Sequence, residues 1–130
     1  KSGPKSFLGL LVPNFPNLFI VSGPGSPSVL TNVPVQIEQH VEWITKCIKF
    51  LENSKRQSIE STNEAANKWQ KEIMNSVKKT LFLKAKSSWY KGDNIPGKSK
   101  SFLPYPGGMP KYRNACLKVE KTNYKELKII

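Results

Sequence analysis

Two neighbouring stretches of the chain carry apolar residues at helical spacing, and this pattern constrains the fold more than any other sequence feature. Asn32 is suited to cap the first stretch, and Pro34 is tolerated in a first helical turn, where its missing N–H does no harm. The spacing predicts a helix over residues 33–53. Its expected buried stripe consists of Ile37, Val41, Ile44, Ile48 and Leu51, widened by Trp43, Cys47 and Phe50.

The second stretch predicts a helix over residues 61–81. Ser61 and Glu64 stand at the spacing of a capping box, which marks a helix start. The expected buried stripe consists of Ala66, Trp69, Ile73, Val77 and Leu81. Because only a short polar loop joins the two predicted helices, we expect them to form an antiparallel pair.

Proline and glycine crowd the two ends of the chain, where helices cannot continue. Near the first end, the apolar run from Leu18 to Val21 predicts a short buried strand over residues 17–22. Residues 84–110 form a long loop, and loops of this length inside a domain are usually functional. Tyr112, Cys116 and Val119 then predict a helix over 109–123. The predicted fold class is mainly α, with a short strand and long loops.

The charge of the chain is strongly basic, with 21 Lys and Arg against nine Asp and Glu and a net charge of +12. Only Arg56 and Arg113 are arginines, and no known nucleic-acid-binding motif occurs, so a solvated lysine surface is favoured. A small basic nucleic-acid-binding module remains an alternative. No apolar run approaches the length of a membrane span. We therefore expect neither a nucleic-acid nor a membrane partner, and a cytoplasmic location.

Few side chains in the sequence are suited to catalysis. The single histidine, His40, has no partner at metal-ligand spacing and is expected at the surface or the edge of the core. Cys47 falls on a predicted buried face, where a thiol serves as an apolar filler. No nucleophile and base can be paired, so we predict no catalytic residue and no metal site.

Two segments are better suited to ligand binding than to catalysis. A glycine-rich turn leads into the helix near Asn32 and Val33, and a helix N-terminus attracts an electron-rich ligand atom. More often, however, a glycine-rich turn before a helix only reverses the chain and binds no ligand. Trp89 and Tyr90 lie in the long polar loop, where aromatic side chains can close over a flat ligand or simply anchor the loop.

Three sequence stretches carry a resemblance to a known family. They read FPNLFIVSGPGSPSVLTNVPVQIEQHVEWI at 15–44, SSWYKGDNIPGK at 87–98 and FLPYPGGMPKYRNAC at 102–116. In this order they resemble the C-terminal portion of Baeyer–Villiger monooxygenases, over about residues 6–124. That family uses FAD, NADPH and O₂ to insert an oxygen atom beside a ketone carbonyl, which gives an ester or a lactone.

The resemblance implies that the chain is the C-terminal part of the FAD-binding domain of an α/β flavoprotein with two dinucleotide-binding domains. It would then be incomplete as an independent fold, with the upstream FAD and NADP domains as partners. Residues 1–33 would hold the strand and the flavin-proximal turn, 34–82 the helical pair, 83–110 an NADP-covering loop, and 111–130 the last helix and tail.

Roles for individual residues follow from the same resemblance. Val33 matches the position whose backbone approaches the flavin, although a methionine is commoner there. Trp89 matches a tryptophan that hydrogen-bonds to NADP. The ketone pocket would be lined by Ser28, Val29 and Leu30. Because the family's nucleotide-binding fingerprints and active-site arginine lie upstream, the isolated chain is expected to be inactive. A scaffold fragment without catalytic function remains the alternative.

Overall fold

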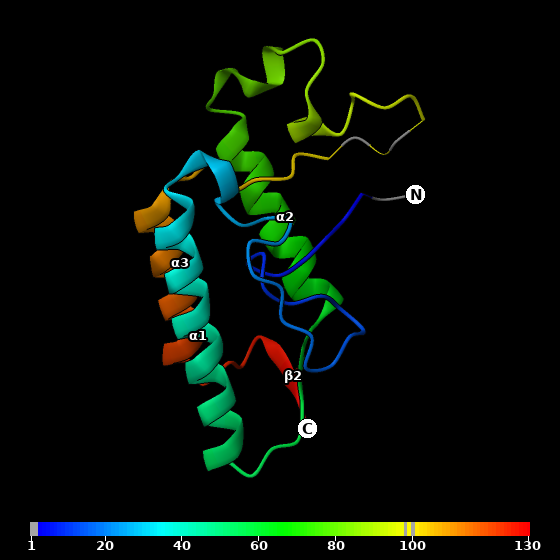
Figure 1. Cartoon of the computed structure of the whole chain (residues 1–130). Helices are drawn as coiled ribbons and strands as arrows, with labels where there is room; N and C mark the ends of the chain where they lie inside the picture. Colours follow the sequence, from blue (N-terminus) through cyan, green and yellow to red (C-terminus); the bar gives the residue numbers. More distant parts are fainter. Residues whose placement is uncertain (1–2, 98, 100) are drawn as a thin grey trace.

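The computed structural model describes residues 3–97, 99 and 101–130. Its main elements are the helices α1 (Val33–Asn53), α2 (Asn63–Val77) and α3 (Met109–Lys121), shown in Figure 1. Two short strands, β1 (Ile59–Ser61) and β2 (Leu127–Ile129), pair in an antiparallel sheet. Three single-turn 3-10 helices complete the regular structure of the described residues: η1 (Ser28–Leu30), η2 (Leu81–Lys84) and η3 (Trp89–Lys91). The fold is mostly helical, as predicted.

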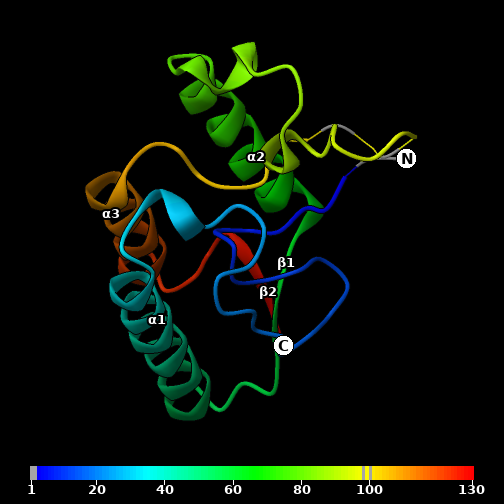
Figure 2. The same ribbon diagram turned by 45° about the horizontal axis from the view of Figure 1, so that its top comes forward.

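Helix α1 packs against α3, and the N-terminal segment runs between this pair and α2 (Figures 1 and 2). The Trp43 indole Nε1 on α1 donates to the Cys116 carbonyl on α3 at 3.3 Å. The expected antiparallel pairing of the first two helices is therefore wrong. The reason is that the N-terminal segment lies between α1 and α2 and separates them (Figures 1 and 2).

The centre of the core is formed by the N-terminal segment, a position that its sequence did not indicate. Phe7, Leu8, Leu10 and Leu11 are almost completely buried. The strand predicted over residues 17–22 does not form, and only an isolated bridge joins Phe19 to Leu11. Asn17 and Ser22 take positive φ angles, which interrupt an extended backbone, and the aliphatic run between them is partly exposed.

Helix α1 has the predicted bounds, but its buried face is shifted to one side of the predicted stripe. The Asn32 side chain accepts a hydrogen bond from the Val35 N–H at 3.3 Å, as expected of a cap. The buried residues are Gln36, His40, Trp43, Cys47 and Leu51. Of the predicted residues, Trp43, Cys47 and Leu51 are buried, Ile44 and Phe50 are partly buried, and Ile37, Val41 and Ile48 are exposed. The polar side chains Gln36 and His40 occupy the inner face because each finds hydrogen-bond partners there.

Helix α2 is shorter at both ends than predicted. Thr62, and not Ser61, caps it by accepting from the Ala65 N–H at 3.0 Å, while Ser61 belongs to β1. The helix ends at Val77, so Leu81 of the predicted stripe is exposed. Ala66, Trp69, Ile73 and Val77 are buried, as predicted. On α3, the predicted inner residues Tyr112, Cys116 and Val119 are also buried.

Candidate functional site

The glycine-rich turn before α1 is fixed by the core residues that surround it. We call residues 22–28 the 22–28 turn. Gly25 has a φ of +90°, and a Cβ atom there would lie 3.1 Å from the indole Nε1 of Trp69, so only glycine fits without strain. That Nε1 donates to the Gly25 carbonyl at 2.9 Å. The Gly25 N–H donates to Leu103, and Tyr105 donates back to Ser26, so the segment after the long loop clamps the turn.

Helix α1 holds the same turn from its other side. Gln36 Nε2 donates to the Ser22 hydroxyl at 2.7 Å, and Nδ1 of His40 accepts from the Ser22 backbone N–H at 3.0 Å. His40 is fully buried, which corrects the expectation of a surface or core-edge histidine. Burial lowers the pKa of His40 to about 4, so the imidazole is neutral at pH 7.

The N-terminus of α1 presents an available backbone donor. Pro34 has no N–H, the Val35 N–H is bonded to the Asn32 side chain, and the Gln36 N–H is bonded to the Asn32 carbonyl. Within the described residues, the Val33 N–H is therefore the donor of this turn for which no acceptor is found, and the Val33 residue is partly exposed. This end of the helix fits an electron-rich group placed against the backbone.

The single turn η1 joins the 22–28 turn to α1 and contacts the helix. Of the three residues predicted for a ketone pocket, Val29 is half exposed. Leu30 packs partly against the core, and Ser28 has a φ of +48°. These three side chains thus differ in surroundings, and of the three only Ser28 lines a hollow together with residues of the long loop.

Trp89 lies on η3 in the long loop, with half of its surface exposed. Its ring packs on that of Tyr90 with centroids 4.2 Å apart. The loop around it is held by Asp93, whose carboxylate accepts from the Ser88 N–H at 2.7 Å and pairs with Lys91 at 2.8 Å. The hydrogen bond from Lys91 is the main reason why the pKa of Asp93 is lowered. Neighbouring residues therefore hold this part of the loop.

The 22–28 turn and the long loop enclose a small hollow of about 190 Å³, which we call the Trp89 hollow. Its lining residues are Ser22, Gly23, Pro24, Ser28, Trp89, Leu103 and Pro104. The structure thus brings Ser28 and Trp89, 61 positions apart in the sequence (89 − 28), to one surface feature. Val33, Val29 and Leu30 are not part of its lining. Ser22, Leu103 and Pro104 also line it; they lie in the stretches that carry the resemblance, but the sequence assigned no individual role to them.

The described residues supply no side chain for nucleophilic or acid–base chemistry at this hollow. Burial raises the pKa of the Cys47 and Cys116 thiols to about 12 each, so neither forms a thiolate near neutral pH. No cluster of three or more metal-ligating side chains occurs in the described part of the chain. The arrangement is suited to holding and orienting a ligand.

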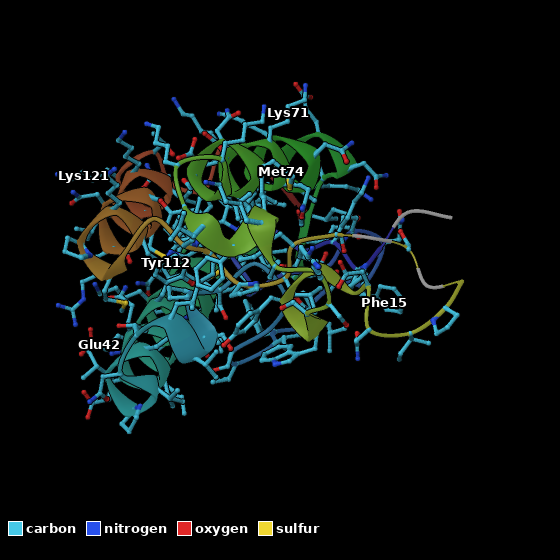
Figure 3. The ribbon with its side chains drawn as sticks, turned by 90° about the horizontal axis from the view of Figure 1, so that it is seen from above. Phe15, Glu42, Lys71, Met74, Tyr112 and Lys121 are labelled. Carbon is cyan, nitrogen blue, oxygen red and sulfur yellow. The ribbon has the colours of Figure 1, made fainter. Side chains whose placement is uncertain are left out.

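A larger hollow of about 480 Å³ lies elsewhere, between α2 and α3. It is lined by Trp69, Lys68 and Glu72 of α2, by Lys111, Asn114 and Lys118 of α3, and by core residues beneath them. None of the residues predicted for cofactor or substrate binding lines it. Figure 3 shows Lys71 of α2 and Lys121 of α3 at the outside of the molecule, and Tyr112 toward its interior. In the described residues, no helix combines the length and apolarity needed to cross a membrane.

The chain is similar in sequence to known monooxygenases. No protein-family model matches the chain. It is 43% identical over 116 residues to cyclohexanone 1,2-monooxygenase of an Acinetobacter species, covering 89% of this chain and 21% of that protein. It is 41% identical over 127 residues to a Baeyer–Villiger monooxygenase of Pseudooceanicola batsensis, covering 98% of this chain and 23% of that protein.

Solved structures give the same result. Cyclohexanone monooxygenase from Rhodococcus sp. Phi1 bound to NADP⁺ matches with a TM-score of 0.90 at 38% identity, over 98% of this chain and 24% of that chain. A complex of OTEMO with FAD and NADP matches with a TM-score of 0.87 at 29% identity, over 98% of this chain and 23% of that chain. The chain thus spans between a fifth and a quarter of the length of these proteins.

Proposed function

From its homology, over nearly its whole length, to the C-terminal portion of Baeyer–Villiger monooxygenases, we propose that this chain forms one wall of a flavin- and NADPH-dependent active site. The complete enzyme would insert one oxygen atom from O₂ beside a ketone carbonyl and release an ester or lactone. The observation that carries the proposal is the convergence of the 22–28 turn and Trp89 on one hollow. The start of α1 follows that turn through η1.

The exposed side of α1 supports an assembly with a larger protein. Val33, Ile37, Val41 and Ile48 are each at least 36% exposed and follow one another at helical spacing, and we call them the α1 apolar face. A contiguous exposed apolar stripe marks an interaction surface. Because the relatives are four to five times longer, the upstream FAD and NADP domains of such a protein are the proposed occupant.

The start of α1 fits the flavin by its backbone chemistry. The partial positive charge of a helix N-terminus stabilises negative charge, and the Val33 N–H is available to donate to a ring atom. FAD, when bound, supplies the redox chemistry between NADPH and O₂. Since the backbone makes this contact, the Val33 side chain would influence the substrate more than it influences flavin retention.

The long loop fits the role of a cover for NADP. The Trp89 indole N–H can donate a hydrogen bond but cannot accept one, and Trp89 is half exposed, so a ligand can contact it. Ser28 borders the same hollow, so a ketone held near η1 would lie close to the NADP that Trp89 covers. The described residues of this chain would orient the ligands, and none of their side chains at the hollow is suited to proton transfer.

The proposal is tested with a fusion of residues 1–130 to the upstream portion of the Acinetobacter cyclohexanone 1,2-monooxygenase, replacing the homologous C-terminal portion. We expect the fusion to bind FAD and to oxidise NADPH faster when cyclohexanone is present. The upstream portion expressed alone is the control. FAD binding without any ketone-dependent turnover would overturn the proposal and favour the scaffold alternative, in which packing is retained without function.

A further inference from the structure

His40 connects three distant parts of the chain inside the core. Its Nδ1 accepts from the backbone N–H of Ser22 at 3.0 Å. Its Nε2 lies 2.8 Å from the hydroxyl of Tyr112 on α3, and that hydroxyl lies 2.6 Å from the Leu8 carbonyl. His40 and Tyr112 are both 0% exposed. One imidazole therefore ties the 22–28 turn to α1, α3 and the N-terminal segment.

The two terminal groups of this hydrogen-bonded chain, the Ser22 N–H and the Leu8 carbonyl, determine the direction of each hydrogen bond between them. The Ser22 backbone N–H can only donate, so Nδ1 of His40 is the unprotonated, accepting nitrogen. The Leu8 carbonyl can only accept, so the Tyr112 hydroxyl donates its hydrogen bond to that carbonyl. The neutral ring then carries its proton on Nε2 and donates it to the Tyr112 oxygen. No other arrangement of protons satisfies all three contacts.

The backbone of Ser22 has a reason to need this anchor. Ser22 has a φ of +59°, a left-handed conformation that is unfavourable for a residue other than glycine. Helix α1 binds its backbone through His40 and its hydroxyl through Gln36, both of which are fully buried. A strained residue persists where the surrounding contacts over-determine it, and such residues cluster at ligand sites. Ser22 lines the Trp89 hollow.

We propose that His40 is a positioning residue, which fixes the 22–28 turn through the Ser22 N–H and thereby sets the shape of the Trp89 hollow and the enzyme's preference among ketones. The link to ketone preference rests on the proposed function, whereas the hold on the turn does not. His40 touches no ligand and transfers no proton in this role. Gln36 supports it from the preceding turn of α1.

Two substitutions of equal polarity separate the two halves of the imidazole. His40→Asn keeps an accepting oxygen close to the place of Nδ1 and loses the contact with Tyr112. His40→Gln places its polar group near the place of Nε2 and loses the acceptor for Ser22. Because the asparagine side chain is one methylene shorter than glutamine, a general loss of packing would harm His40→Asn more than His40→Gln, which is the opposite of the order expected here.

Hydrogen exchange, measured by mass spectrometry on the fusion with the upstream domains, tests the hold on the turn. We expect peptides that contain Ser22 to lose about three- to tenfold protection in His40→Gln and to keep most of it in His40→Asn. Peptides from the second half of α1 should be protected in both. Equal exchange of the turn in the two variants overturns the proposal, whether or not the fusion turns over a ketone.

The ratio of kcat/KM for cyclopentanone to that for cyclohexanone tests the consequence for the site. This ratio is independent of the amount of folded enzyme, so a merely structural role would leave it unchanged. We expect His40→Gln to shift it by about three- to tenfold, and His40→Asn to restore the wild-type ratio. An unchanged ratio in His40→Gln overturns the link to specificity. A wild-type fusion without turnover counts against the proposed function, and the exchange experiment still decides the role of His40.

Discussion

At the scale of single residues, burial determines which ionisation state the histidine and the two cysteines take. The sequence offers one histidine and two cysteines, and all three are buried among apolar groups and hydrogen-bond partners. Burial withholds the charged form from each of them. The burial of His40 could not be predicted from the sequence. It depends on hydrogen bonds to Ser22 and Tyr112, which lie 18 and 72 positions away, and no local sequence pattern indicates such distant partners.

Acidification should destabilise the chain through His40. In the unfolded chain an imidazole binds its proton near pH 6.5, whereas in the folded chain the pKa of His40 is about 4. Between these values the unfolded state holds the extra proton, so the free energy of unfolding falls as the pH falls. Lowering the pH from 7.5 to 5 should cost about 2 kcal/mol. Urea unfolding at several pH values measures this, and His40→Asn should remove most of the slope above pH 5.

The two thiols should be inert while the chain is folded. The pKa of Cys47 and of Cys116 is raised to about 12, so almost no thiolate exists at pH 8, and both side chains are inaccessible. Ellman's reagent should label neither thiol in the native chain and both in urea. Rapid labelling of one thiol before unfolding would show that α1 and α3 separate readily.

Trp89 carries the residue-scale prediction about the cofactor. In the fusion, Trp89→Ala should lower kcat/KM for NADPH by about 1–3 kcal/mol, or roughly five- to 150-fold, because one polar contact and the packing of a ring are lost. FAD content should stay normal. Trp89→Phe keeps the ring and removes the indole N–H, so it should recover part of the loss. Stopped-flow flavin reduction across NADPH concentrations measures the effect, and equal kinetics in all three proteins would make Trp89 a loop anchor only.

At the scale of elements, the bounds of α1 were predictable, and its buried face was predictable only in part: Trp43, Cys47 and Leu51 are buried as expected, whereas Gln36 and His40 were not foreseen. Asn32 and Pro34 mark the start locally, and local chemistry decides where a helix begins. The face depends on what packs against it. The aliphatic stripe from Ile37 to Ile48 is the more regular one, yet the described chain leaves most of it exposed. If the upstream domains cover this stripe, the regular apolar spacing of α1 reflects burial in a larger protein and not burial within the described chain.

Substitutions on the α1 apolar face test this account. Val41→Lys and Ile48→Lys should leave the stability of the isolated chain within about 0.5 kcal/mol, because both positions are already exposed. In the fusion they should reduce the yield of FAD-containing protein severalfold, since a charge would be buried there. Asn53→Lys, at an exposed position off this face, is the matched control. Equal yields from all variants would show that nothing covers the face.

At the scale of the whole molecule, the compact arrangement depends on contacts that the two end segments make with the middle of the chain. Phe7 to Leu11 fill the centre, and β2 closes the structure by pairing with β1. Neither feature follows from periodicity, because the first is a series of turns and the second is only three residues long. The helical class, the inner faces of α2 and α3, and the turn before α1 were predictable from spacing and from glycine and proline placement.

Oxygen insertion by the assembled protein tests the central claim most directly. The fusion of residues 1–130 with the upstream domains is supplied with NADPH, cyclohexanone and ¹⁸O₂, and the product is analysed by mass spectrometry. We predict a lactone that carries one ¹⁸O atom, and none from the upstream portion alone. A fusion that is folded and loaded with FAD but forms no labelled lactone would contradict the account.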